Sequence, residues 1–145
     1  MAVQIVEGVF DPAALQSAHE KTLQAGAFGA TASFVGTMRR INEGDEVVGM
    51  MLEHYPGMTE KELQKIIDDA TSQWRIIDAL IVHRVGDMVP GEPIVLTAVW
   101  SMHRKDAFEA VRFLMEALKS RAPFWKKETL AGGGSRWVEK NTPGY

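Results

Sequence analysis

The stretch WSMHRKDAFEAVRFLMEALKSRAPFWKKE, residues 100–128, decides how the chain is organised. It predicts the end of a buried strand, then a helix over about Lys105 to Ser120 that stops before Pro123, then a strand over Phe124 to Leu130. Cations gather at the joints between these elements, although the whole chain has a formal net charge of -3. This local reversal of charge indicates an anionic ligand.

The rest of the chain alternates between predicted strands and helices. Asp11 and Pro12 predict the start of one helix, which would end near Gly26, and Thr59 with Glu62 predicts a capping box at the start of another. Apolar patterns predict the remaining strands over Val3–Val9, Gly29–Met38, Val47–Tyr55, Ile76–Val85, Ile94–Trp100 and Arg136–Glu139.

This order of elements contains two hairpins, which disfavour a purely parallel sheet. It predicts an α+β fold of two layers, with helices packed on one face of a mostly antiparallel sheet. No repeat or linker interrupts the pattern, so we expect a single domain over residues 1–145 with a loose tail at about 141–145.

Composition excludes several classes of protein. The chain has no cysteine, which excludes disulfides, thiolate metal sites and a cysteine nucleophile. No apolar run approaches the roughly 18 residues of a membrane span, and the start lacks a signal peptide, so we expect a cytoplasmic protein without a membrane partner. The negative net charge argues against a nucleic-acid partner, although the aromatic and basic segment at 124–127 resembles a weak stacking platform.

Lys119 is the first candidate for chemistry. It follows Met115 by four residues, so its stem lies at the edge of the apolar face of the predicted helix. Partial desolvation beside other cations would favour a neutral, reactive amine. On this pattern alone, a snorkelling lysine that complements the helix C-terminus is the more common interpretation.

Two other basic pairs are candidates for an anion site. His103 and Arg104 precede the predicted helix, where exposed backbone N–H groups favour anions, although a polar surface turn would look the same. Alternation in the last long strand places Lys126 and Lys127 on opposite faces, so at most one of them faces a given pocket.

The remaining histidines give no metal site. His54 and His83 lie in strand-like segments without a close second ligand, and each is more typical of a structural histidine. We therefore predict neither a metal nor a cofactor.

Six ordered segments carry a resemblance to a known family. Together the chain closely resembles the large, catalytic subunit of molybdopterin synthase over about residues 3 to 140. The segments are FVGTMR (34–39), LEHYPGM (52–58), HRVG (83–86), HRKDAF (103–108), KSRAPFWKKE (119–128) and RWV (136–138).

The resemblance implies both a fold and a function. The implied fold is an α/β hammerhead with a small added antiparallel subdomain. The implied assembly is a homodimer whose protomers each bind a small ubiquitin-like sulfur-carrier subunit, which gives a heterotetramer. The implied enzyme is a sulfurtransferase of molybdenum cofactor biosynthesis. It moves sulfur from the thiocarboxylate at the carrier's Gly-Gly C-terminus to cyclic pyranopterin monophosphate, and so forms the dithiolene of molybdopterin.

The resemblance also implies roles for individual residues. Lys119 and Lys126 match the family's catalytic lysines, with Lys127 and Glu128 adjacent to the substrate. Residues 37–39, which are Thr37, Met38 and Arg39, would line the pterin pocket, and His103 with Arg104 would hold the phosphate. Met38 and the triple glycine at 132–134 depart from the common family pattern.

A second interpretation comes from another class of protein. A non-catalytic anion-binding or scaffold homologue would keep the dimer and the carrier groove without the chemistry. The presence of both Lys119 and Lys126 favours the enzyme.

Overall fold

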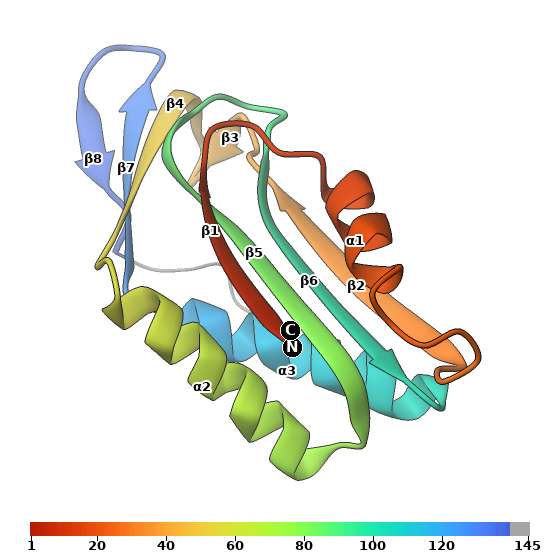
Figure 1. The fold of residues 1–145 in the computed structure, drawn as a ribbon. Coiled ribbons are helices and arrows are strands. Elements are labelled where there is room, and N and C mark those ends of the chain that lie inside the picture. The colour runs from red at the N-terminus through yellow and green to blue at the C-terminus, as the bar shows by residue number, and fades with distance from the viewer. Residues whose placement is uncertain (140–145) are drawn as a thin grey trace.

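The structure is a computed structural model that describes residues 1–139. Within this range it contains three helices and eight strands (Figure 1). The helices are α1 (Pro12–Glu20), α2 (Met58–Gln73) and α3 (Arg104–Arg121). The strands are β1 (Ala2–Glu7), β2 (Ala30–Thr37), β3 (Ile41–Asn42), β4 (Asp45–His54), β5 (Ile76–Met88), β6 (Pro93–Ser101), β7 (Phe124–Leu130) and β8 (Ser135–Trp137). The predicted loose tail lies outside the described residues.

The long strand β5 joins two parts of one sheet. Its first part pairs with β6 and, in parallel, with β1, whereas Gly86–Met88 at its end pairs with β4. The order along the sheet is β2-β6-β5-β4-β7-β8, and β3 pairs with β4. Apart from the pairing of β1 with β5, all described pairings are antiparallel. The predicted α+β fold is confirmed, and β3, β4, β7 and β8 form an added antiparallel subdomain at the upper left of Figure 1.

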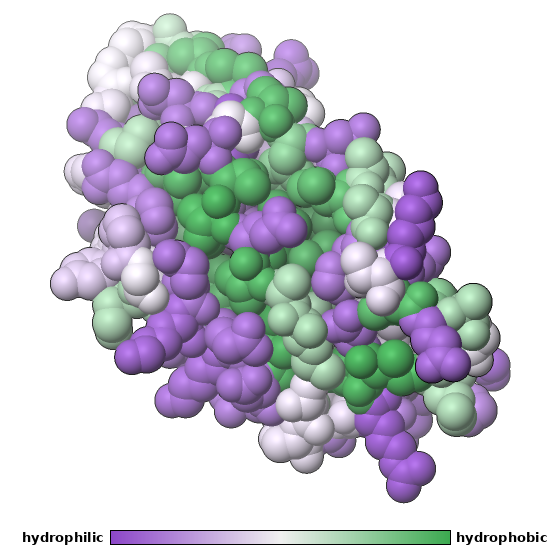
Figure 2. All heavy atoms as spheres, in the orientation of Figure 1, coloured by the Kyte–Doolittle hydropathy of each residue, from purple (hydrophilic) through white to green (hydrophobic). Residues whose placement is uncertain are grey.

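The helices cover both faces of the sheet, which differs from the prediction of one covered face. Leu63 of α2 and Leu114 of α3 share a core with Ile81 of β5. Leu15 of α1 packs against the core that contains Leu80, the neighbouring residue of β5. Because successive residues of a strand point to opposite faces, α1 lies on the face opposite α2 and α3. Figure 2 shows polar side chains over α2 at lower left and a band of apolar side chains across the middle of the view.

One predicted helix start is right and the other is wrong in detail. The Asp11 side chain accepts a hydrogen bond from the Ala14 N–H at 3.1 Å, as an N-cap does. In α2 the cap is Gly57, whose φ of 85° suits glycine, and Glu60 accepts from its N–H at 3.1 Å. Thr59 lies inside the helix. Its buried hydroxyl accepts from the Tyr55 N–H and donates to the carbonyl of Pro123, just before β7.

The first helix is also shorter than predicted. It ends at Glu20, because Leu23 and Phe28 leave the helical path and pack against the sheet core that also holds Trp100.

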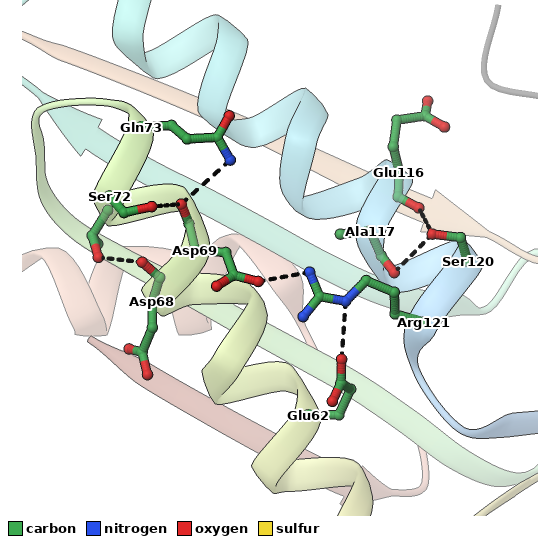
Figure 3. Close-up of polar contacts among 10 residues, drawn as sticks. Glu62, Asp68, Asp69, Ser72, Gln73, Glu116, Ala117, Ser120 and Arg121 are labelled. Carbon is green, nitrogen blue, oxygen red and sulfur yellow. Dashed lines mark hydrogen bonds and ion pairs between the residues drawn. The ribbon is translucent and has the colours of Figure 1, made fainter.

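The C-terminal end of α3 is tied to α2 by Arg121 (Figure 3). Its Nε donates to Glu62 at 3.0 Å and its Nη1 donates to Asp69 at 2.8 Å. Beside it, Leu114 and Leu118 bury the apolar face of α3 against the sheet. The last turn of α3, which carries Lys119, is therefore held from two sides. Within residues 1–139, no helix has the length and apolar character needed to cross a membrane.

Candidate functional site

Two cavities meet at a pair of lysines. Lys119 lies in the last turn of α3 and Lys126 is the third residue of β7. Both side chains line a cavity of about 270 Å³ that also contains Arg39, which we name the arginine cavity. Both also line a neighbouring cavity of about 470 Å³ that contains Trp125 and Trp137, which we name the tryptophan cavity. The lysine pair therefore stands where two separate ligands could meet.

The arginine cavity brings together residues that are far apart in the sequence. Thr37, Met38 and Arg39 enter it from the end of β2, and Lys119, Lys126 and Glu128 enter from the other side. The backbone of Met38 is held on both sides, because its N–H donates to the Glu92 carbonyl and its carbonyl accepts from the Gly91 N–H, each at 2.9 Å. The structure thus places six of the predicted site residues around one cavity.

Glu128 forms the polar wall of this cavity. It is only 5% exposed, and its two oxygens accept from Asn42 Nδ2 at 2.9 Å and from Arg136 Nε at 3.0 Å. Arg136 also donates to Asp45 at 2.8 Å and to the Asn42 carbonyl at 2.8 Å. These bonds tie the β3–β4 hairpin to β7 and β8, so the hairpin forms a fixed side of the cavity. The sequence interpretation assigned no role to Asn42.

The fold lowers the pKa of the Lys126 amine. Burial, followed by the charge of Lys119 and a hydrogen bond with it, lowers the pKa of Lys126 to about 7, while Glu128 opposes this effect. Near neutral pH this amine can both take and give a proton. The sequence makes Lys119 one candidate for a neutral amine, with a snorkelling lysine as the more common interpretation; the structure supports a neutral amine at Lys126.

The tryptophan cavity has a buried histidine at its base. His83 is 1% exposed, and its ring stacks on Phe124 with centroids 3.8 Å apart and an interplanar angle of 16°. Burial, together with the nearby charges of Lys119 and Lys126, lowers the pKa of His83 to about 3, although a hydrogen bond to the Arg84 carbonyl opposes this. The sequence predicts a structural role for His83, because its position in an alternating strand cannot be distinguished from that of an ordinary core residue.

Three predicted site residues lie outside both cavities. Lys127 points to the other face of β7, as alternation predicted, and its Nζ lies 5.6 Å from the centroid of the Trp137 ring. His103 and Arg104 are at the N-terminal end of α3, about 22 Å along the helix axis from Lys119. A single protomer therefore does not bring the predicted phosphate clamp to the lysine pair.

Among the described residues, no three histidine or acidic side chains are grouped so that they could hold a metal ion. The polar groups at the lysine pair are amines, a guanidinium and a carboxylate that is already bonded to Asn42 and Arg136. Such a set favours anionic ligands and proton transfer.

Comparison with known proteins gives concordant matches. The family model described as "MoaE protein" matches residues 7–121. A "Molybdopterin synthase catalytic subunit" from Ralstonia nicotianae is 52% identical over 139 residues, which cover 94% of this chain and 76% of that protein. One of the same description from Pseudomonas aeruginosa is 49% identical over 140 residues, with 96% and 91% covered. The crystal structure of molybdopterin synthase from Staphylococcus aureus matches with a TM-score of 0.83 at 32% identity, covering 93% of this chain and 95% of that one.

Proposed function

The chain belongs to the MoaE protein family, and we propose how its structure performs the family's role as the catalytic subunit of molybdopterin synthase in molybdenum cofactor biosynthesis. The reaction is the transfer of sulfur from the C-terminal thiocarboxylate of a small ubiquitin-like carrier subunit to cyclic pyranopterin monophosphate. Two such transfers form the dithiolene of molybdopterin. The observation that carries this proposal is the meeting of two cavities at Lys119 and Lys126.

Each cavity suits one of the two reactants. The arginine cavity offers a guanidinium, backbone groups at the end of β2 and a buried carboxylate, which can orient a polar heterocycle. The tryptophan cavity is lined by Phe124, Trp125 and Trp137, between which an extended Gly-Gly tail without side chains can pass. The carrier's terminal sulfur then arrives at the lysine pair, next to the pterin.

The lysine pair supplies the charge and the proton transfer that the reaction needs. A thiocarboxylate is an anion, and an ammonium group stabilises both it and the negative charge that develops on the attacked substrate. We assign this role to Lys119. Because the pKa of Lys126 is about 7, we assign to it the transfer of a proton to or from the substrate.

His103 and Arg104 fit this scheme if they serve the cavity of a second copy. Strand β2 lies at one end of the sheet order and exposes Phe34 and Val35 by 45% and 43%. Unpaired edge strands of this kind readily pair with one another, and a twofold axis would make the pairing antiparallel. The Thr37 end of one β2 then lies beside the Ala30 end of the other. Since Ala30 pairs with Ser101, His103 and Arg104 of the second copy come close to the arginine cavity.

Mixing two inactive variants tests the shared cavity. A Lys119→Ala protomer paired with an Arg104→Ala protomer has one cavity with both changes and one with neither. If the protomers exchange freely between dimers, half of the dimers contain one protomer of each variant, and each of these mixed dimers has one intact site of two. The mixture should therefore recover about a quarter of wild-type turnover. No recovery, despite mixed dimers detected by mass spectrometry, would show that each protomer uses only its own residues.

The function itself is tested by mixing the protein with a thiocarboxylated carrier and the cyclic pterin and measuring molybdopterin by mass spectrometry. We expect Lys119→Ala to lower the turnover about a hundredfold or more, because general acid–base and electrostatic contributions have this size. The affinity for the carrier, measured by calorimetry, should change little.

The matched control is Lys21→Ala, which removes an exposed lysine just after α1 and should leave turnover unchanged. Near-normal turnover in Lys119→Ala would contradict the assigned role. Carrier binding without any product in the wild-type protein would favour the non-catalytic scaffold instead.

A further inference from the structure

His83 is a buried polar side chain that the proposed reaction does not yet use. It lies on the same face of β5 as Ala79 and Ile81, beneath the end of α3. Its ring forms part of the wall of the tryptophan cavity together with both lysines of the pair. A polar group in this position faces the same cavity as the two amines to which the proposed function assigns the reaction.

The surroundings of His83 fix both its orientation and its tautomer. Nδ1 lies 2.8 Å from the Arg84 carbonyl oxygen, and a carbonyl only accepts hydrogen bonds, so Nδ1 carries the hydrogen. Stacking on Phe124 at 3.8 Å prevents the ring from tilting. Nε2 is then left without a hydrogen, as an acceptor on the edge of the ring that is turned away from the strand backbone.

We propose that His83 is a positioning residue for sulfur transfer, whose Nε2 accepts a hydrogen bond from an amine of the lysine pair and holds that amine toward the substrate. This rests on the proposed function of the pair. It adds to that function a hydrogen-bond acceptor of fixed position, the Nε2 atom of His83, in the wall of the tryptophan cavity. This acceptor limits the directions in which a flexible lysine side chain can point.

His83 is suited to be an acceptor and unsuited to be a base. Because its pKa is about 3, it stays neutral throughout the working range and does not compete with the lysines for protons. The charged and titratable groups around the lysine pair come from several elements. They are Lys119 of α3, Lys126 and Glu128 of β7, Arg39 after β2, His54 of β4, Glu139 after β8 and His83 itself.

Two substitutions of His83 distinguish the effect of losing the Nε2 acceptor from the effect of losing the stack on Phe124. His83→Asn keeps a polar group near the position of Nδ1 and removes Nε2, whereas His83→Gln places an amide oxygen near the position of Nε2. Both lose the stack on Phe124, so their stabilities should fall together. We expect His83→Asn to lower kcat about tenfold to a hundredfold, the range for a lost hydrogen bond to a charged group, and His83→Gln to recover most of it.

A titration without substrate tests the contact independently of the reaction. An acceptor stabilises the ammonium form of a lysine, so its removal should lower the pKa of Lys126 in His83→Asn relative to His83→Gln. NMR of labelled lysine measures this directly. The pH at which turnover is half-maximal should move in the same direction.

The proposal is overturned if both variants have the same lysine titration and equal kcat. It is also overturned if nitrogen NMR of the wild-type protein finds the hydrogen of His83 on Nε2. That last measurement needs neither a folded variant nor substrate. A missing product in the wild-type assay would instead refute the proposed function, and the titrations would still report on His83.

Discussion

Replacing Lys126 by methionine should stabilise the protein while it removes activity. Methionine keeps an apolar stem of similar length and has no charge to bury. In the folded protein the ammonium form of Lys126 is disfavoured by burial, by the charge of Lys119 and by their hydrogen bond. In the unfolded chain the same group is fully hydrated. The wild-type protein therefore gives up stability in order to hold this amine in place.

The size of the effect follows from the two pKa values. The ordinary pKa of 10.5 and the folded pKa of about 7 differ by about 3.5, and each pKa unit corresponds to about 1.4 kcal/mol, so the full cost below pH 7 is about 5 kcal/mol. At pH 7 half of the folded molecules already carry a neutral Lys126, so the cost there is about 4 kcal/mol. Between pH 7 and 10.5 the unfolded chain binds more protons at this position, so wild-type stability rises with pH there. The cost is fully present below pH 7 and has disappeared above pH 10.5. The gain in Lys126→Met should shrink over the same range.

Urea denaturation at a fixed protomer concentration, at several pH values from 6 to 10, measures this gain. The matched control is Lys127→Met, because that neighbour lies on the other face of β7 over Trp137, and we expect little change from it. The reasoning is refuted if Lys126→Met is no more stable than wild type at neutral pH. It is also refuted if the difference between them does not depend on pH.

Three further substitutions test how the site is held. Arg121→Met should lower kcat several-fold at unchanged carrier affinity, since the turn that carries Lys119 loses its ion pairs to α2. Gly29→Ala should lower the free energy of unfolding by about 1–3 kcal/mol in urea, because its Cβ would lie 2.5 Å from the Met102 carbonyl oxygen and the segment before α3 must shift. Arg136→Ala should raise KM for the pterin but leave carrier affinity unchanged, since it releases the β3–β4 hairpin.

Each of these has a neighbouring control. Arg75→Met removes an exposed arginine just beyond α2 and should leave kcat unchanged. Gly132→Ala adds a Cβ that meets no atom within 4 Å and should cost little stability. Asp45→Asn weakens one bond of Arg136 while Glu128 keeps its own, so KM should rise less than in Arg136→Ala. Equal effects of a variant and its control would contradict the role given to that residue.

Several features of the site were predictable because they depend on local geometry. Alternation along one strand separated Lys126 from Lys127, and the structure places them on opposite faces as expected. The helical wheel placed Lys119 at the edge of the buried face, where it lines both cavities. The helix length already implied that His103 lies far from Lys119, because each residue adds a fixed rise.

Other features needed the folded chain. The face covered by α1 could not be predicted, since a short amphipathic helix can pack on either side of a sheet. His83 occupies a strand position that looks like any core position in the sequence. The role we propose for it depends on its stack with Phe124 and on the cavity that it shares with the two lysines, and both come from the folded chain. The predicted start of α2 differs from the observed one because Thr59, a good capping residue, instead donates to the carbonyl of Pro123, just before β7.

The sequence by itself determined the helices and the strands other than β3, their order and the identity of the cations at their joints. These follow from periodicity, turn residues and helix caps, which act over a few residues. Only the tertiary structure decided that Arg39 and Lys126 share a cavity, because residues so far apart meet through the strand order of the sheet. It also decided that Lys126 titrates near neutral pH. That property comes from burial and from the charge of Lys119, and no short stretch of sequence contains either.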